Sequence, residues 1–174
     1  MKREQLLILA WGAPALALIL GAFWAVDASL YVLPKDWQDD RLRLGATCAA
    51  ALGFWLIVAV LRVSLHRFFS DVDRPGAGLT EAPSPALRIK RANLQNTLEQ
   101  VVLAALAHIA YAATAPQPAL AILPLFVALF SLGRIAFMAG YRFGAAGRAF
   151  GFGLSFGPTL ALYFLLAAQL FSDG

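Results

Sequence analysis

Charged residues are scarce in this sequence. Only 14% of its 174 residues are Asp, Glu, Lys or Arg, whereas 60% are hydrophobic and the mean hydropathy is +0.70. A soluble domain could not bury that much apolar surface. Four long stretches contain no Asp, Glu, Lys or Arg, namely residues 5–26, 44–61, 100–133 and 149–172. A helix needs roughly 20 apolar residues to cross a bilayer core of about 30 Å, so the sequence predicts an integral membrane protein.

The third stretch is too long for one membrane span. Pro116 and Pro118 interrupt it, and two prolines so close together end one helix and start another. No segment alternates polar and apolar residues as the spans of a β-barrel do. The fold class predicted is therefore an all-α membrane protein with five spans, near residues 5–26, 44–65, 93–114, 118–139 and 149–171.

Cysteine is almost absent too. The single thiol, Cys48, excludes an intramolecular disulfide and a thiolate metal site. Elsewhere we find no His, Asp and Glu residues at metal-ligand spacing, no Ser/His/Asp set, and no phosphate loop with a Gly-Lys-Ser/Thr ending. We expect no metal. His108, alone within a span, is interpreted as a hydrogen-bonded packing residue, with proton relay as the alternative.

The basic residues are distributed unevenly between the two sides of the membrane. If the N-terminus is cytoplasmic, 11 of the 14 fall inside, as positively charged loops do in membrane proteins. This asymmetry indicates topology and gives no support for nucleic-acid binding. We expect a bacterial inner membrane location. The inside set is Lys2, Arg3, Arg62, Arg67, Arg74, Arg88, Lys90, Arg91, Arg134, Arg142 and Arg148, and the outside set is Lys35, Arg41 and Arg43.

The first span has a second interpretation, a secretory signal cleaved near Val26-Asp27-Ala28. Its uncharged run of about 22 residues exceeds the 7–15 typical of a signal sequence, which favours a retained helix. Either outcome leaves the other four spans in the same orientation.

Polar residues form a stripe at the start of the third span. Arg91, Gln95 and Glu99 share a helix face with Arg88, and Asn96 borders it. A carboxylate two turns inside a span needs a cationic partner, either a protein arginine or a ligand ammonium group. The plainer alternative is a snorkelling helix end in which Glu99 pairs with an arginine of a neighbouring helix.

A second polar cluster follows the fourth span. Arg134 and Tyr141 are seven residues apart and share a helix face, and Arg148 follows Gly144 and Gly147, where we expect the helix to break and restart. Because the topology brings both clusters to the cytoplasmic edge, we expect a pocket for a small zwitterionic or dicarboxylic ligand, with one buried acid. The glycines recurring at four-residue spacing from residue 140 to residue 157 are interpreted as close contacts between helices.

These residues resemble those of a known family. Arg91-Ala92 followed by Asn96-Thr97-Leu98-Glu99, then Arg134 to Tyr141, then Arg148, is similar to the MAPEG family, the membrane-associated proteins of eicosanoid and glutathione metabolism. The resemblance covers roughly residues 44–172. It implies a homotrimer of four-helix bundles that binds glutathione between subunits at the cytoplasmic edge. Residues 1–43 would then be an additional N-terminal span with an external loop, and residues 44–174 the four-helix membrane domain.

The resemblance also implies a role for each site residue. Asn96 and Glu99 match glutathione-binding residues, with Glu99 on the ligand's amino group; Arg134 and Tyr141 match binding positions on the penultimate helix. Arg148 matches the arginine that stabilises the glutathione thiolate, and a guanidinium beside a thiol does lower its pKa. The sequence departs from the family pattern at three positions. Arg91 lies five residues before Asn96 instead of four, with Gln95 in the adjacent slot, and Phe137 and Gln100 stand where tyrosine and an aromatic residue are usual.

We therefore expect a glutathione-dependent transferase or peroxidase that acts on hydrophobic, lipid-like electrophiles. The alternative is a non-catalytic lipid-binding or scaffold protein of the same fold. A transporter is disfavoured, because no span has paired charges at its midplane and no inverted repeat is visible.

Overall fold

The computed structural model describes residues 3–75 and 82–172, together with the side chains of most of them. Its five long helices are each long and apolar enough to cross a membrane, which confirms the predicted fold class. They are α1 (Arg3–Asp27), α3 (Arg41–Phe69), α4 (Pro85–Thr114), α5 (Ile122–Gly140) and α6 (Gly144–Ser172). Shorter elements are α2 (Lys35–Asp39) and the 3-10 helices η1 (Gln117–Ala121) and η2 (Tyr141–Phe143).

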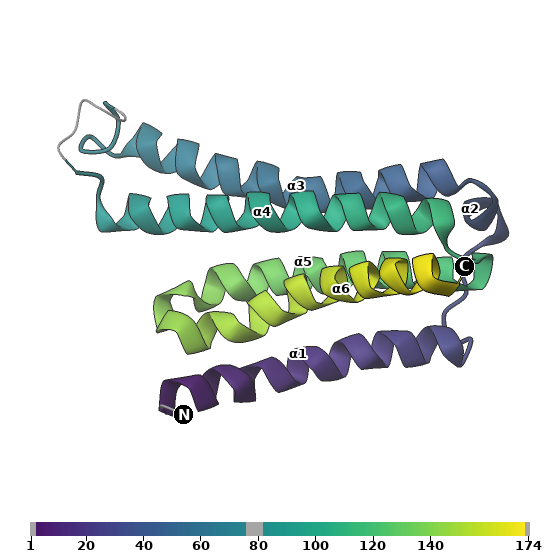
Figure 1. The fold of residues 1–174 in the computed structure, drawn as a ribbon. Coiled ribbons are helices and arrows are strands. Elements are labelled where there is room, and N and C mark those ends of the chain that lie inside the picture. The colour runs from purple at the N-terminus through teal and green to yellow at the C-terminus, as the bar shows by residue number, and fades with distance from the viewer. Residues whose placement is uncertain (1–2, 76–81, 173–174) are drawn as a thin grey trace.

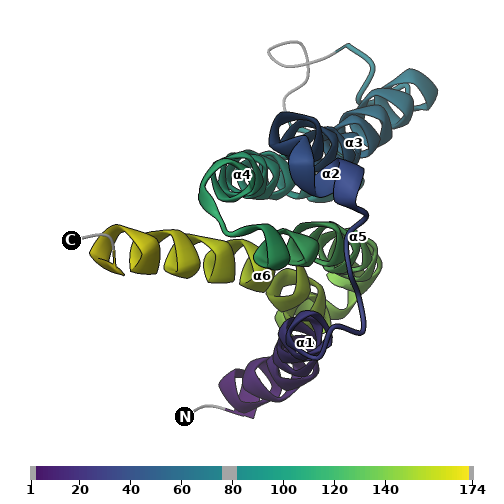
Figure 2. The same cartoon turned by 90° about the vertical axis from the view of Figure 1, so that its right-hand side faces the viewer.

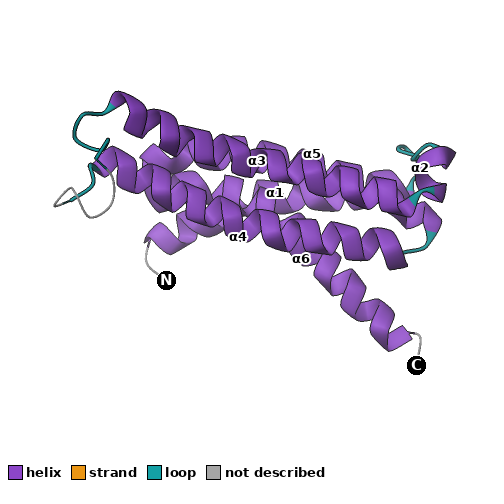
Figure 3. Ribbon diagram, turned by 90° about the horizontal axis from the view of Figure 1, so that it is seen from above, coloured by secondary structure: helices purple, strands orange, loops and turns teal. Residues whose placement is uncertain are grey.

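The helices form two layers with a fifth helix outside them. The pair α3 and α4 lies over the pair α5 and α6, and α1 runs along the outer side of the second pair (Figures 1 and 2). The second half of α6 diverges from the bundle (Figure 3). The start of α1, the end of α3, the start of α4 and the α5–α6 turn lie at one end, which we call the loop end (Figure 1). The α1–α3 segment and the end of α6 lie at the other, which we call the far end.

The break between α4 and α5 falls where the two prolines predict it. α4 ends at Thr114, and Pro116 precedes η1. The last carbonyls of a helix have no partner within the helix, and here Arg41 supplies one. Its Nη1 donates to the carbonyl oxygens of Ala112, at 3.1 Å, and Ala115, at 2.7 Å.

The start of α4 lies eight residues before the predicted boundary. Ser84 caps the helix, because its hydroxyl accepts a hydrogen bond from the backbone N–H of Leu87 at 3.1 Å, and Pro85 occupies the first helical turn. Hydropathy located the apolar part of this helix. The polar residues from Arg88 to Arg91 continue the same helix outward.

The core lies between the layers, and the outer faces are apolar as well. Phe126 and Phe130 are fully buried, and Trp55 Nε1 donates to Ser131 Oγ at 2.9 Å to join α3 and α5. His108 is buried, and its Nδ1 lies 2.7 Å from the carbonyl oxygen of Ala104, which confirms its interpretation as a hydrogen-bonded packing residue. Exposed Leu, Ile, Val and Phe side chains recur along all five long helices, as in a protein surrounded by lipid.

Glycines set the distance between α5 and α6. A Cβ atom at Gly140 would lie 2.0 Å from the carbonyl oxygen of Gly147, and one at Gly151 would lie 2.2 Å from the backbone nitrogen of Phe137. These positions confirm the prediction of close helix contacts. Gly144 acts differently: it has a φ of +75° and turns the chain from η2 into α6.

Basic residues gather in the half of the bundle nearest the loop end. Most of the basic residues that we predict to lie on the cytoplasmic side belong to the parts of α3, α4, α5 and α6 in this half. Lys2 lies outside the described residues. Lys35, Arg41 and Arg43 lie at the far end.

Candidate functional site

A buried arginine connects α5 to α4. Arg134 is 0% exposed, and its two terminal nitrogens donate to Asn96 Oδ1 at 2.9 Å and to Thr97 Oγ1 at 2.7 Å. Its Nε has no hydrogen-bond partner, and no ion pair in the described part of the chain includes it. A buried cation without a counter-charge is costly, so this region of the bundle is electrostatically suited to an anion.

Arg134 also orients Asn96. Because the guanidinium donates to Oδ1, the amide nitrogen of Asn96 is left free to donate to another group. The sequence predicted both residues as site members. Thr97 belongs to the motif that resembles the family, but the sequence assigned it no role; it is fully buried and also donates its hydroxyl to the carbonyl oxygen of Asn93 at 2.7 Å.

Aromatic rings connect the buried Arg134 of α5 to Arg148 of α6. The guanidinium carbon of Arg134 lies 4.6 Å from the ring centroid of Phe137, and that ring meets the ring of Tyr141 edge to face at 5.8 Å. The guanidinium carbon of Arg148 in turn lies 4.3 Å from the ring centroid of Tyr141. Cation–π contacts of this kind hold a charged group in place while leaving its edge open.

Arg148 lies in the second turn of α6, directly after the turn at Gly144. Its Nε donates to the carbonyl oxygen of Gly144 at 3.2 Å, and its terminal nitrogens make no hydrogen bond with any described residue. The side chain is half-buried. It is therefore a fixed cation whose donors are available to a ligand.

These elements line an open, shallow hollow of about 290 Å³ near the loop end. Its walls come from α4, α5 and α6, and Arg148 is the only charged side chain among the residues that line it. Arg134 lies behind the wall and acts on the hollow through Asn96 and Phe137. The lining residues are Asn96, Phe137, Ala145, Arg148, Ala149 and Phe152.

The other predicted residues of α4 lie outside this hollow. Gln95 and Glu99 are exposed, with Gln95 Nε2 donating to Glu99 Oε1 at 2.9 Å, and Arg91 is half-buried. The expectation of a buried acid is therefore wrong for the single chain. The buried face of α4 is instead taken by Asn93, Thr97 and Gln100, which follow one another at helical spacing. Within the described residues, no arginine pairs with the Glu99 carboxylate.

Gln100 departs from the family pattern for a structural reason. Its Oε1 accepts a hydrogen bond from Ser155 Oγ at 2.7 Å, and both side chains are buried between α4 and α6. An amide at this position thus joins two of the three helices that line the hollow.

The sequence suggests no Ser/His/Asp set, but the structure brings Ser84, His66 and Asp73 together at the loop end. Asp73 accepts from Ser84 Oγ at 2.6 Å and from Ser84 N at 3.0 Å, and His66 Nε2 lies 2.9 Å from Asp73 Oδ2. In a catalytic triad the serine and the acid use opposite imidazole nitrogens, but here both face Nε2, while Lys90 lies 3.0 Å from Nδ1.

This set is therefore a structural clamp that connects the end of α3 to the start of α4. The backbone N–H and hydroxyl of Ser84 hold the pKa of Asp73 well below its ordinary value, because both donate to the ionised carboxylate. Ser84 and Asp73 are eleven residues apart in the sequence and lie outside any predicted span, so no sequence pattern links them.

The fold and the site together define an α-helical integral membrane protein with a cationic hollow between three of its spans. Residues 45–168 match the model of the MAPEG family, so the chain belongs to that family. Neither a curated protein nor a solved structure matches the sequence. Membership is consistent with glutathione-related transferase or peroxidase chemistry.

Proposed function

We propose that this protein is a membrane-embedded glutathione-dependent transferase or peroxidase that acts on hydrophobic electrophiles. The observation that supports it best is the Arg148 guanidinium, which is half-buried, fixed against Tyr141 and free of any acid partner among the described residues. It lines the same hollow as Asn96 of α4, which offers an amide donor to that space.

The donor set fits glutathione, a tripeptide with two carboxylates, one ammonium group and one thiol. Arg148 and Asn96 supply a cation and a neutral donor for anionic groups, and Arg134 keeps the surroundings positive. Glu99 supplies the only carboxylate nearby on α4, and an ammonium group is its natural partner. Tyr141 does not line the hollow itself, but its ring packs against the Arg148 guanidinium.

Arg148 would stabilise the thiolate form of the bound peptide. A positive charge beside a thiol favours loss of its proton to water, which produces the nucleophile. With an aryl halide, the new carbon–sulfur bond forms as halide leaves; with a lipid hydroperoxide, two glutathione molecules are oxidised to the disulfide while the peroxide is reduced to an alcohol and water. The hydrophobic second substrate would reach the hollow from the bilayer.

We further propose that the functional unit is a homotrimer with glutathione held between subunits. Glu99 and Gln95 project from the bundle within a membrane-spanning helix, and a carboxylate facing lipid is costly. A site completed by the neighbouring subunit would bring Glu99, Gln95 and Arg91 of one α4 against a shared ligand. This arrangement accounts for their position outside the hollow of a single chain.

The orientation and the division of the chain are proposals as well. The concentration of basic residues near the loop end favours a cytoplasmic loop end and N-terminus, and a bacterial inner membrane location. We regard residues 1–43 as an addition to the four-helix domain of residues 44–174, because the family match begins at residue 45 and α1 packs outside the two layers.

Activity of the purified protein tests the proposal. In detergent with glutathione, wild-type protein should conjugate a generic aryl halide or reduce a lipid hydroperoxide above the uncatalysed rate, and Arg148→Ala should lose most of that rate. Arg74→Ala is the matched control, because Arg74 is an exposed arginine at the same end of the bundle that pairs with Asp71. Equal rates for wild type and Arg148→Ala would overturn the catalytic assignment.

The alternative is a non-catalytic lipid-binding or scaffold protein. Calorimetric titration distinguishes the two, because the enzyme should bind glutathione at or below about 1 mM, the upper range of typical KM values. Absence of binding at that concentration would favour the scaffold.

A further inference from the structure

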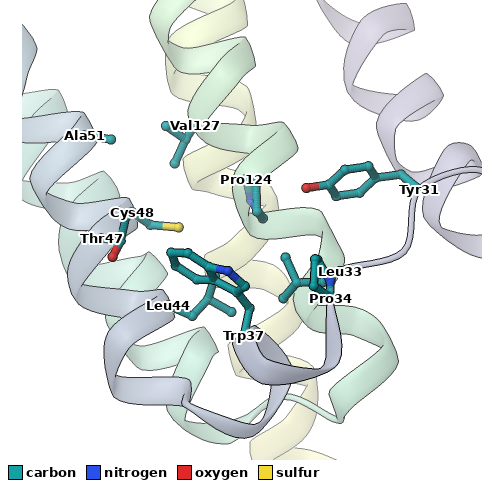
Figure 4. Close-up of a pocket in the computed structure, with 10 residues that line it drawn as sticks. All are labelled: Tyr31, Leu33, Pro34, Trp37, Leu44, Thr47, Cys48, Ala51, Pro124 and Val127. Carbon is teal, nitrogen blue, oxygen red and sulfur yellow. The ribbon is translucent and has the colours of Figure 1, made fainter.

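A second cavity lies at the far end of the bundle. It has a volume of about 380 Å³, within the range of roughly 300–1,000 Å³ seen for small-molecule sites. Figure 4 shows side chains that line it: Trp37 lies next to Leu44 and Cys48, and Pro124 lies between Cys48 and Tyr31. The lining residues are Tyr31, Leu33, Pro34, Trp37, Leu44, Thr47, Cys48, Ala51, Pro124 and Val127.

Three parts of the chain build this cavity. Two walls come from α3 and α5, and the segment between α1 and α3 supplies the third through Tyr31 and Trp37. That segment precedes the region that matches the family model. Val127 is seven residues, or about 10 Å, from Arg134 along α5. The cavity is thus separate from the cationic hollow at the loop end.

The lining is almost entirely apolar and contains no charged side chain. Its polar atoms are the hydroxyls of Tyr31 and Thr47, the Trp37 indole nitrogen and the Cys48 thiol. Thr47 and Ala51 are exposed on α3, within a span that is apolar enough to cross a membrane, so this side of the cavity opens on a bilayer-facing surface. A cavity of this kind excludes ions and accepts a hydrocarbon chain.

The rim of the cavity carries charges. Arg43, Thr47 and Ala51 follow one another at four-residue spacing and share one face of α3, and Arg43 lies over the ring of Trp37 with its guanidinium carbon 4.3 Å from the centroid. Arg43 is therefore fixed above the opening. Nearby, Asp40 caps α3 by accepting from Arg43 N at 2.9 Å, and Asp39 Oδ1 accepts from Gln117 Nε2 at 3.2 Å. The remaining charges on α2, Lys35 and Asp36, are exposed.

We propose that this cavity is a binding site for one acyl chain of a membrane phospholipid, with the lipid phosphate at Arg43. The apolar chain fills the space between α3 and α5, and the mixed charges of the rim suit a zwitterionic head group whose ammonium lies near the acids of α2. The site is independent of the proposed glutathione chemistry, since it lies at the opposite end of the bundle and shares no residue with it.

Photolabelling in lipid nanodiscs tests the site. The full-length protein is reconstituted with a trace of phosphatidylethanolamine that carries a diazirine on one acyl chain, irradiated, and digested for mapping by mass spectrometry. We expect adducts concentrated in residues 31–51 and 124–127. A parallel sample with a diazirine-bearing free fatty acid distinguishes the two sources of an acyl chain, and we expect weaker labelling there.

Variants on one helix provide the control. Ala51→Phe fills the cavity and should lower labelling of these segments about tenfold. This is the loss in affinity expected if roughly two methylene groups of the acyl chain can no longer be buried in the cavity. Ala50→Phe adds the same ring at an exposed position that does not line the cavity, and should leave labelling unchanged. Arg43→Gln should lower it about three- to fivefold, as expected for one exposed charge contact.

Several outcomes would overturn the proposal. They are adducts spread evenly over exposed helix faces, equal labelling of the Ala51→Phe and Ala50→Phe proteins, absence of adducts in residues 31–51, and labelling by the fatty acid alone. Monodisperse elution shows that a variant is folded. Thr47→Phe fills the same opening from one turn away and replaces Ala51→Phe should that protein fail to fold.

Discussion

Replacement of Arg148 by alanine should raise the pKa of the bound glutathione thiol. Two unit charges about 4 Å apart interact with about 1 kcal/mol in water and about 4 kcal/mol near a protein surface. Because Arg148 is half-buried, we assign its interaction with the thiolate an intermediate energy of about 2.7 kcal/mol, which lowers the thiol pKa by about two units. A thiol with an ordinary pKa of about 8.5 would then titrate near about 6.5 beside Arg148. At pH 7 the thiolate population should fall about twentyfold in the variant.

Ultraviolet absorption of the thiolate measures this directly. Protein saturated with glutathione is titrated with base, and the midpoint of the thiolate signal gives the thiol pKa. Arg148→Lys keeps the charge as a more mobile point cation, so we expect a midpoint between those of wild type and Arg148→Ala. Arg74→Ala removes an exposed arginine that already pairs with Asp71 and should leave the midpoint unchanged.

One result would refute this reasoning. If wild type and Arg148→Ala bind glutathione with the same thiol midpoint, Arg148 does not act on the sulfur. The arginine would then be a wall residue held by Tyr141, and the thiolate would have to be stabilised elsewhere.

The remaining predictions concern binding, packing and the loop-end clamp. Glu99→Gln should weaken glutathione binding about tenfold or more in calorimetric titration, because a hydrogen bond to a charged group contributes about 1.5–3 kcal/mol; unchanged affinity would remove Glu99 from the site. Asn96→Asp places a negative charge beside the buried Arg134 guanidinium. We therefore expect an unfolding temperature at least as high as that of wild type, together with about tenfold weaker glutathione binding. A destabilised protein would contradict the contact between residue 96 and Arg134. Gly140→Ala should destabilise the protein by about 1–3 kcal/mol, because its Cβ meets the α6 backbone, whereas Gly53→Ala, with open space around its Cβ, should be neutral or slightly stabilising in the same thermal assay. Asp73→Asn should destabilise the protein at neutral pH. The hydrogen bonds that the Asp73 carboxylate accepts lower its pKa, so the stabilisation that it provides is present above about pH 4 and is lost as the pH falls further. The difference in unfolding temperature between variant and wild type should therefore shrink below about pH 4, and a constant difference would exclude the ionised carboxylate as its source.

Most of the fold was predictable because hydropathy and proline placement act locally. The uncharged stretches located five spans, and Pro116 and Pro118 located the break between α4 and α5. The ends of the helices were harder to predict, because they depend on capping residues that hydropathy does not detect. The polar residues after Pro85 belong to α4 because Ser84 caps it, and a hydropathy window counts them as loop.

The candidate site was predictable in part. Helical spacing and alternating topology brought Arg134, Tyr141 and Arg148 towards the residues of α4, and the structure joins Asn96 to Arg134 and places it in the same hollow as Arg148. The position of Glu99 was not predictable, because helical periodicity tells which residues share a face but not which face is turned inward. The partnership of Asn96 with Arg134 depends on how closely α4 approaches α5, which no single segment encodes.

The most direct test of the account is a structure of the purified protein determined by electron cryomicroscopy with saturating glutathione. We predict a trimer in which density for the peptide contacts Asn96, with its sulfur beside Arg148 and its amino group at Glu99. A well-ordered map in which the hollow holds no peptide, or in which these three side chains face separate surroundings in the assembly, would contradict the glutathione assignment.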